Sequence, residues 1–251
     1  MSYAFCIERN KMIRVLQNGL LANAVFSTEA APMLILALCL FASYLLGSVN
    51  SAVLVSRLFY GEDIRKKGSG NAGLTNTARV YGKKAAACVL LGDVLKTALA
   101  ILITALFFGF RYYYSFSLNG FLYLSAVACV LGHSYPLYFK FKGGKGVLCT
   151  AAAVLILCPA VFAVEILIFA IMLFGFKYVS LASLATAFFY PLLTDRMFRL
   201  FFGVSPDMMI LLSCVFIGLF VFYTHRTNIR RLLDHCENKV SFKKKDKSDK
   251  K

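Results

Sequence analysis

The sequence is poor in charged residues. Only 16% of its 251 residues are charged and 59% are apolar, whereas a typical soluble domain is about 25% charged and about 45–50% apolar. A soluble fold of this size would have too few polar side chains to cover its surface. This composition excludes an ordinary soluble enzyme. Long apolar runs at 32–46, 147–176 and 208–223 indicate helices that span a membrane.

Residue patterns that bind metals are also missing. The eight cysteines show no Cys-x-x-Cys spacing, and most lie within apolar runs, where cysteine behaves as a small hydrophobic residue. The three histidines do not form a cluster with the spacing of zinc ligands. The sequence therefore predicts no metal, no cofactor and no disulfide framework.

Acidic residues are few, with 12 Asp and Glu against 28 Lys and Arg, for a formal net charge of +16. Such an excess can indicate nucleic-acid binding, but no nucleic-acid-binding motif accompanies it. Cytoplasmic loops of membrane proteins collect Lys and Arg. If the amino terminus lies outside, 21 cations fall on cytoplasmic segments and six fall outside. This asymmetry predicts a cytoplasmic carboxyl terminus.

We expect an all-α integral membrane protein with about seven transmembrane helices and an external amino terminus. The expected spans are 33–58, 85–108, 119–138, 147–158, 160–176, 178–193 and 207–224. The fourth and fifth are short for full crossings, so five spans remain the alternative. The predicted divisions are an extension of unknown role at 1–30, a transmembrane domain at 31–238 and a basic cytoplasmic tail at 239–251.

Three predicted cytoplasmic segments combine glycines with hydrogen-bond donors, and the first of them, 68–79, reads GSGNAGLTNTAR. Glycines let backbone N–H groups approach an anion, and Arg79 adds a planar cation suited to phosphate. A flexible turn would explain the glycines but not this density of donors. The candidate donors beside Arg79 are Ser69, Asn71, Thr75 and Asn76.

The second segment comprises GHSYP at 132–136 and FKGGKGV at 141–147, directly before an apolar run. Glycine-rich backbone, lysine and a helix amino terminus together favour phosphate binding. The Walker A pattern is absent, which disfavours an ATPase. The candidate phosphate-binding residues are Lys142, Gly143, Gly144, Lys145 and Gly146.

The third segment, HRTNIRR at 225–231, follows the last expected span. His225 and Asn228 would share one face of a helix and could orient a ligand. Three anion-binding segments at one membrane face predict a phosphorylated, water-soluble substrate and a second substrate or product that stays in the lipid. Within the second span, Asp93 and Lys96 are predicted to neutralise each other.

A small-solute or phosphate transporter is the alternative function. Transporters place polar groups near the bilayer midplane, often in two repeated halves. Here the glycine-rich segments lie at the predicted inner face, and no internal repeat is visible. These features favour an enzyme.

In order and spacing, GSGNAGLTNTAR, GHSYP with FKGGKGV, and HRTNIRRLLDHCEN resemble the signature segments of the bacterial acyl-phosphate:glycerol-3-phosphate acyltransferases, the PlsY family. The resemblance covers about residues 33–240. It implies a seven-span inner-membrane enzyme whose active site faces the cytoplasm. Such an enzyme transfers an acyl group from acyl phosphate to glycerol 3-phosphate and releases lysophosphatidic acid and phosphate. Its other partners would be membrane lipids and, transiently, the enzyme that makes acyl phosphate.

The resemblance also implies roles for individual residues. The matched catalytic positions are Ser69, Arg79, His225 and Asn228; Gly143, Gly144, Lys145 and Gly146 match the glycerol-phosphate loop; Ser180 matches a substrate contact and Glu237 a structural carboxylate. His225 is either a general base or a ligand, and we favour a ligand because the substrate's phosphate can accept the proton in this family. The sequence departs from the family at Asn50-Ser51, where proline is usual, and at Leu74, where a small residue is usual.

Overall fold

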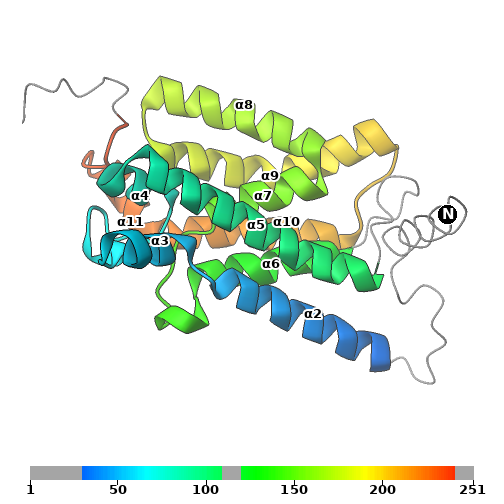
Figure 1. Cartoon of the computed structure of the whole chain (residues 1–251). Helices are drawn as coiled ribbons and strands as arrows, with labels where there is room; N and C mark the ends of the chain where they lie inside the picture. Colours follow the sequence, from blue (N-terminus) through cyan, green and yellow to red (C-terminus); the bar gives the residue numbers. More distant parts are fainter. Residues whose placement is uncertain (1–29, 109–119, 241–251) are drawn as a thin grey trace, which may run out of the picture.

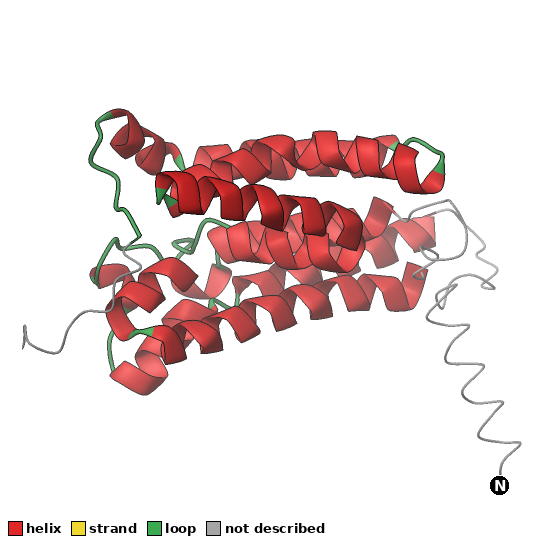
Figure 2. Ribbon diagram, turned by 90° about the horizontal axis from the view of Figure 1, so that it is seen from above, coloured by secondary structure: helices red, strands yellow, loops and turns green. Residues whose placement is uncertain are grey.

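The computed structural model describes residues 30–108 and 120–240, and this part of the chain consists of helices, turns and loops without strands (Figure 2). Long helices lie side by side in a bundle (Figure 1): α2 (Ala30–Ser48), α5 (Lys83–Phe108), α6 (Gly120–Ser134), α8 (Pro159–Phe176), α9 (Val179–Phe202) and α10 (Met208–Thr224). The expected all-α fold is confirmed.

Shorter elements lie at one end of the bundle (Figure 1): α3 (Ser51–Tyr60), η1 (Ile64–Lys66), α4 (Leu74–Tyr81) and α11 (Arg226–Leu233). The helix α7 (Val147–Leu157) packs against α5, α6 and α8, and η2 (Leu137–Phe139) follows α6. Of these, η1 and α4 lie in a predicted cytoplasmic segment in which no helix was expected, α11 is the helix expected to carry Asn228, and α3 forms the last part of the expected span 33–58.

The bundle has an apolar interior and an apolar outside. Its core includes Ile101, Leu122 and Ile217, which are at most 1% exposed. Large apolar side chains also lie on the surface of the long helices, for example Leu38 and Phe174. Such a continuous apolar exterior is what contact with lipid requires. The structure is that of an integral membrane protein.

Within residues 30–108 and 120–240, four helical segments are long and apolar enough to cross a membrane: Ala31–Tyr60, Lys83–Phe108, Gly120–Phe139 and Pro159–Phe176. A fifth is added if α10 and α11, which meet at a bend of 58°, count as one span. With 11 residues, α7 is about 16 Å long, well short of the hydrocarbon core of about 30 Å. The count of seven spans and the orientation of the termini stay predictions.

The helix α9 extends beyond the expected membrane span. It continues to Phe202, nine residues past the expected end of the span at 193. Asp195 and Arg199 form an ion pair of 2.9 Å one turn apart, which supports a helix where the apolar pattern has ended. Gly203, with φ of 68°, ends it. The predicted domain limits stay predictions, and residues 1–29 and 241–251 of the extension and tail lie outside the described residues.

Candidate active site

A cavity of about 660 Å³ lies where the short helices and loops meet the bundle. Every residue that the sequence analysis selected for the site lines this cavity: Ser69, Asn71, Thr75, Asn76, Arg79, Lys142, Gly143, Gly144, Lys145, Gly146, Ser180, His225, Asn228 and Glu237. Segments more than 150 residues apart in the sequence thus converge on one site.

Asn76 organises the first segment. Its side-chain oxygen accepts a hydrogen bond from the backbone N–H of Ser69 at 2.8 Å, and its nitrogen donates to the carbonyls of Lys67 and Asn71, both at 3.0 Å. Gly68 has a φ of +56°, and a side chain there would overlap Asn76. Because its amide is engaged within the loop, Asn76 shapes the segment and is not free to bind substrate as we expected.

The glycine loop before α7 is held by the end of α6. The N–H groups of Gly143 and Gly144 donate to the carbonyls of Ser134 and His133, each at 3.1 Å. These two N–H groups are therefore not free for phosphate, which corrects that part of the expectation. The reason is that the last carbonyls of α6 need donors. The first-turn N–H groups at the start of α7, just after Gly146, receive no side-chain cap within the described part of the chain, and they remain suited to an anion.

Arg65 joins the first two segments and was not selected from the sequence. Its guanidinium donates to the carbonyls of Phe139 at 2.9 Å and Lys142 at 3.0 Å. It also donates to both carboxylate oxygens of Asp63, at 2.9 and 2.7 Å. The guanidinium of Arg65 thereby holds the segment before the glycine loop in place. It also lowers the pKa of the Asp63 carboxyl.

The third segment forms a network around Glu237. Asn228 accepts a hydrogen bond from Lys145 and donates to Glu237 at 2.9 Å. Arg231 and Ser180 donate to the same carboxylate at 2.7 and 3.2 Å. These contacts favour the structural role expected for Glu237, since it fixes Asn228 and Ser180 at the cavity wall.

His225 lies between α10 and α11 and is 3% exposed. Its Nδ1 lies 2.8 Å from the carbonyl oxygen of Val221. A carbonyl can only accept, so Nδ1 carries a proton and Nε2 is the acceptor of the neutral ring. Burial and the charge of Lys145 lower the pKa of His225 to about 4. The ring is neutral at physiological pH.

The part of the cavity around Lys145 is cationic. Burial and the charges of Arg231 and Arg79 lower the pKa of Lys145 to about 8. Burial opposes the charge on Glu237, but hydrogen bonds from Arg231 and Asn228 outweigh it and keep its pKa below the ordinary value. At neutral pH three cations, Arg79, Lys145 and Arg231, therefore lie near the carboxylate of Glu237. That carboxylate is itself paired with Arg231. This imbalance favours an anionic ligand.

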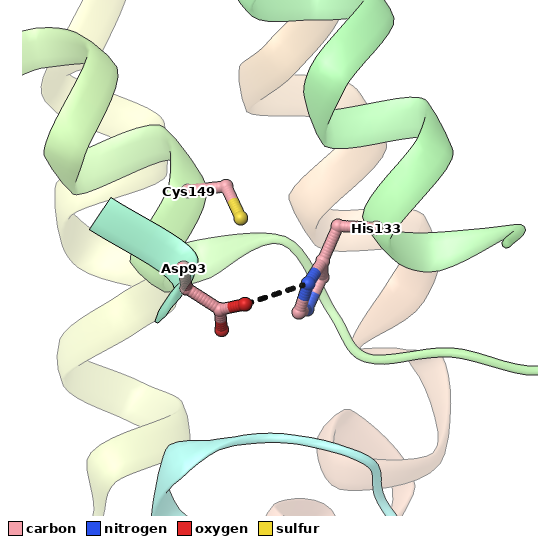
Figure 3. A group of neighbouring side chains, drawn as sticks. All are labelled: Asp93, His133 and Cys149. Atoms are coloured by element: carbon pink, nitrogen blue, oxygen red, sulfur yellow. Dashed lines mark ion pairs between the residues drawn. The ribbon is translucent and has the colours of Figure 1, made fainter. Parts of the chain in front are cut away.

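Figure 3 shows a further buried group beside the cavity, with Asp93 and His133 directed toward each other and Cys149 nearby. The ligand atoms of these three residues lie within 4.8 Å of one another. Lys96 Nζ, however, lies 2.8 Å from Asp93 Oδ1 and 2.9 Å from His133 Nδ1. The ammonium of Lys96 occupies the ligands that a metal would use. The predicted pairing of Asp93 with Lys96 is confirmed.

The departure from the family pattern at Asn50-Ser51 has a structural role. Asn50 caps α3 by accepting from the N–H of Val53 at 3.0 Å, and its side-chain nitrogen donates to the carbonyl of Ala72 at 3.4 Å. Ser51 donates to Asp93 Oδ1 at 2.9 Å. The two residues tie the start of α3 to the first segment and to the buried carboxylate. Leu74 starts α4 and packs at the edge of an apolar cluster.

Residues of α8 and α9 also line the cavity. They include the apolar side chains of Phe162, Ile166, Phe169 and Ala187 and the buried Glu165, which is 7% exposed. Of the α8 and α9 residues at the cavity, the sequence analysis selected Ser180 alone, because the apolar residues that line the cavity are not distinguishable in sequence from those that pack in the core.

A family model described as glycerol-3-phosphate acyltransferase matches residues 37–235. This chain belongs to the glycerol-3-phosphate acyltransferase family. Similar curated relatives include a glycerol-3-phosphate acyltransferase of Bacillus cytotoxicus, 38% identical over 86% of this chain and 100% of the relative. Another, from Geobacillus kaustophilus, is 38% identical over 82% of this chain and 96% of the relative.

Two solved structures of PlsY (YgiH), an integral membrane glycerol 3-phosphate acyltransferase, share the fold. The glycerol 3-phosphate form matches with a TM-score of 0.70 and 33% identity, covering 82% of this chain and 96% of that one. The lysophosphatidic acid form matches with a TM-score of 0.68 and 32% identity, covering 82% and 95%. The family resemblance seen in the sequence is confirmed, and with it an integral membrane acyltransferase.

Proposed function

We propose that this protein transfers a fatty acyl group from acyl phosphate to the sn-1 hydroxyl of glycerol 3-phosphate, forming lysophosphatidic acid and phosphate. The observation that carries the proposal is the mixed lining of the cavity, which includes cations such as Lys145 and Arg79 as well as apolar side chains of α8 and α9. The cations suit phosphate groups, and the apolar side chains suit an acyl chain. The glycerol 3-phosphate and lysophosphatidic acid forms of PlsY support both assignments.

The proposed reaction needs no nucleophile from the protein, because acyl phosphate is an activated mixed anhydride. The glycerol oxygen attacks the carbonyl carbon and forms the new ester bond. The bond from that carbon to the phosphate oxygen breaks, and the departing phosphate takes the electron pair and the hydroxyl proton. The protein contributes by positioning the two substrates and by stabilising the charge that develops on the leaving group.

We assign the residues as follows. Arg79 and Lys145 bind phosphate oxygens, and Ser69 donates a further hydrogen bond. His225, a weak base with a pKa of about 4, accepts a hydrogen bond from the glycerol hydroxyl through Nε2 and orients it. Asn228, held by Glu237, keeps Lys145 in place.

The test is an assay of purified protein with acyl phosphate and radiolabelled glycerol 3-phosphate, with acyl-CoA offered in parallel. We expect labelled lysophosphatidic acid to form when acyl phosphate is the donor and not when acyl-CoA is the donor. Product formed only from acyl-CoA would refute the proposed donor. Movement of solute across proteoliposomes without acylation would instead favour the transporter. Arg79→Ala serves as the inactive control.

We further propose that the protein lies in the bacterial inner membrane with its cavity facing the cytoplasm. The excess of cations around the cavity-forming segments supports this orientation. A reporter fused after Lys251 should be cytoplasmic, and one inserted into the loop between α9 and α10 at 203–207 should be external. A cytoplasmic reporter at 203–207 would contradict the seven-span topology.

A further inference from the structure

Lys96 is 5% exposed, and its ammonium lies within hydrogen-bond distance of three described groups. Its Nζ lies 2.8 Å from Asp93 Oδ1, 2.9 Å from the carbonyl oxygen of Val49 and 2.9 Å from His133 Nδ1. An ammonium has three hydrogens to donate and no lone pair with which to accept. Each hydrogen therefore has one partner, and Nδ1 of His133 is an acceptor.

This arrangement fixes the tautomer of His133. Because Nδ1 accepts from Lys96, the proton of the neutral ring is on Nε2, and a doubly protonated ring would carry a proton there as well. Among the described residues Nε2 makes no hydrogen bond, and His133 lines the cavity. The ring thus offers an N–H donor that the fold itself does not use.

The Nε2 atom of His133 lies directly against the glycine loop. A Cβ built on Gly144 would overlap Nε2, and a Cβ on Gly143 would overlap the carbonyl oxygen of His133. The missing side chain at position 144 is what allows the ring edge to reach the loop that carries Lys145. The donor and the cation therefore face the same part of the cavity.

We propose that His133 is an additional substrate-binding residue whose Nε2–H donates to a phosphate oxygen beside the glycine loop. Lys96, held by Asp93, is a positioning residue that fixes the donor tautomer. This inference deepens the proposed function and rests on it. A neutral donor next to Lys145 adds a directed hydrogen bond to the anion site without adding charge.

Two substitutions separate the donor from the rest of the ring. In His133→Gln the side-chain amide can reach the place of Nε2 and donate, whereas in His133→Asn it is too short and ends near Nδ1. We expect His133→Asn to raise the KM for one of the two substrates roughly tenfold or more, with a smaller change in kcat. We expect the KM of His133→Gln to return most of the way to the wild-type value. Measuring the KM for glycerol 3-phosphate and for acyl phosphate separately identifies which phosphate is bound. His235→Gln, at an exposed histidine, is the matched control.

A measurement without turnover keeps this inference separate from the proposed function. In protein labelled with ¹⁵N-histidine, the His133 signal, identified by its loss in His133→Gln, should show protonated Nε2. Adding inorganic phosphate should shift the Nε2 resonance of His133 and leave that of His235 unchanged. An Nε2 resonance that does not respond to phosphate, or wild-type KM values for both substrates in His133→Asn, would overturn the inference. Failure of the proposed function would appear differently, as wild-type protein that makes no lysophosphatidic acid.

Discussion

The ammonium groups of Lys96 and Lys145 lie in opposite kinds of environment. Lys96 has a carboxylate, a carbonyl and a ring nitrogen within 2.9 Å. Lys145 is half-buried and donates to the neutral side chain of Asn228, while the charges of Arg79 and Arg231 oppose its own. The first charge is compensated within the protein, and the second is not.

This difference indicates a structural role for Lys96 and a ligand-binding role for Lys145. Removing one partner of a buried, compensated ion pair leaves the other without a partner and destabilises the fold. A cation with insufficient partners, in a cavity, is instead suited to bind an anion. Substitution of Lys96 or Asp93 alone should therefore affect stability first, and substitution of Lys145 or Arg79 should affect activity first.

The largest effect is expected for Lys96→Met. It leaves the carboxylate of Asp93 buried without its cation, so the free energy of unfolding should fall by about 3–5 kcal/mol. The double variant Asp93→Leu with Lys96→Met removes the pair instead of breaking it and should recover most of this loss. Denaturation in detergent measures both, with exposed Lys142→Met as control. If Lys96→Met is as stable as the wild type, the comparison fails.

Arg79→Ala should lower turnover about 10²–10³-fold and leave stability and membrane insertion unchanged, because Arg79 is exposed at the cavity rim. Arg79→Lys should restore activity only in part, since an ammonium cannot form the bidentate contact of a guanidinium. Initial rates of purified variants check this, with Lys66→Ala as control. Full activity in either Arg79 variant would refute the proposed phosphate contact.

The pKa of Lys145, at about 8, predicts a pH dependence. Below pH 8 the ammonium is charged and attracts phosphate; above it the neutral amine does not. The kcat/KM for glycerol 3-phosphate should therefore fall about tenfold between pH 7 and pH 9, following the protonated fraction. Lys145→Arg should flatten this fall, because arginine stays charged. A wild-type profile that is level up to pH 9 would count against Lys145 as the phosphate cation.

The smallest effect is expected for His225→Gln. If His225 orients the substrate, the KM for glycerol 3-phosphate should rise roughly tenfold or less, with kcat less affected. Because the pKa of His225 is about 4, and not the unperturbed 6.5 or so, protonation of His225 should cause no loss of activity near pH 6.5. A large fall in kcat at constant KM would instead identify His225 as a general base.

Some outcomes depended on contacts that the residue pattern alone does not show. The N–H groups of Gly143 and Gly144 were expected to bind phosphate, but they donate to the last turn of α6. Asn76 was expected to bind substrate, but it is engaged by its own loop. Arg65 was counted only as a cytoplasmic cation, although it bridges two segments of the site. Each outcome depends on hydrogen-bond partners that folding brings close.

The sequence by itself determined the fold class, the family and many of the polar residues that line the site. Apolar runs leave helices in a membrane as the stable arrangement, and glycine-rich segments with donors are local patterns that survive in the fold. Only the tertiary structure decided which charges are compensated. Lys96 and Lys145 are the same residue type, and the difference between them comes from the groups around each, which α5, α6 and α11 bring together when the bundle forms.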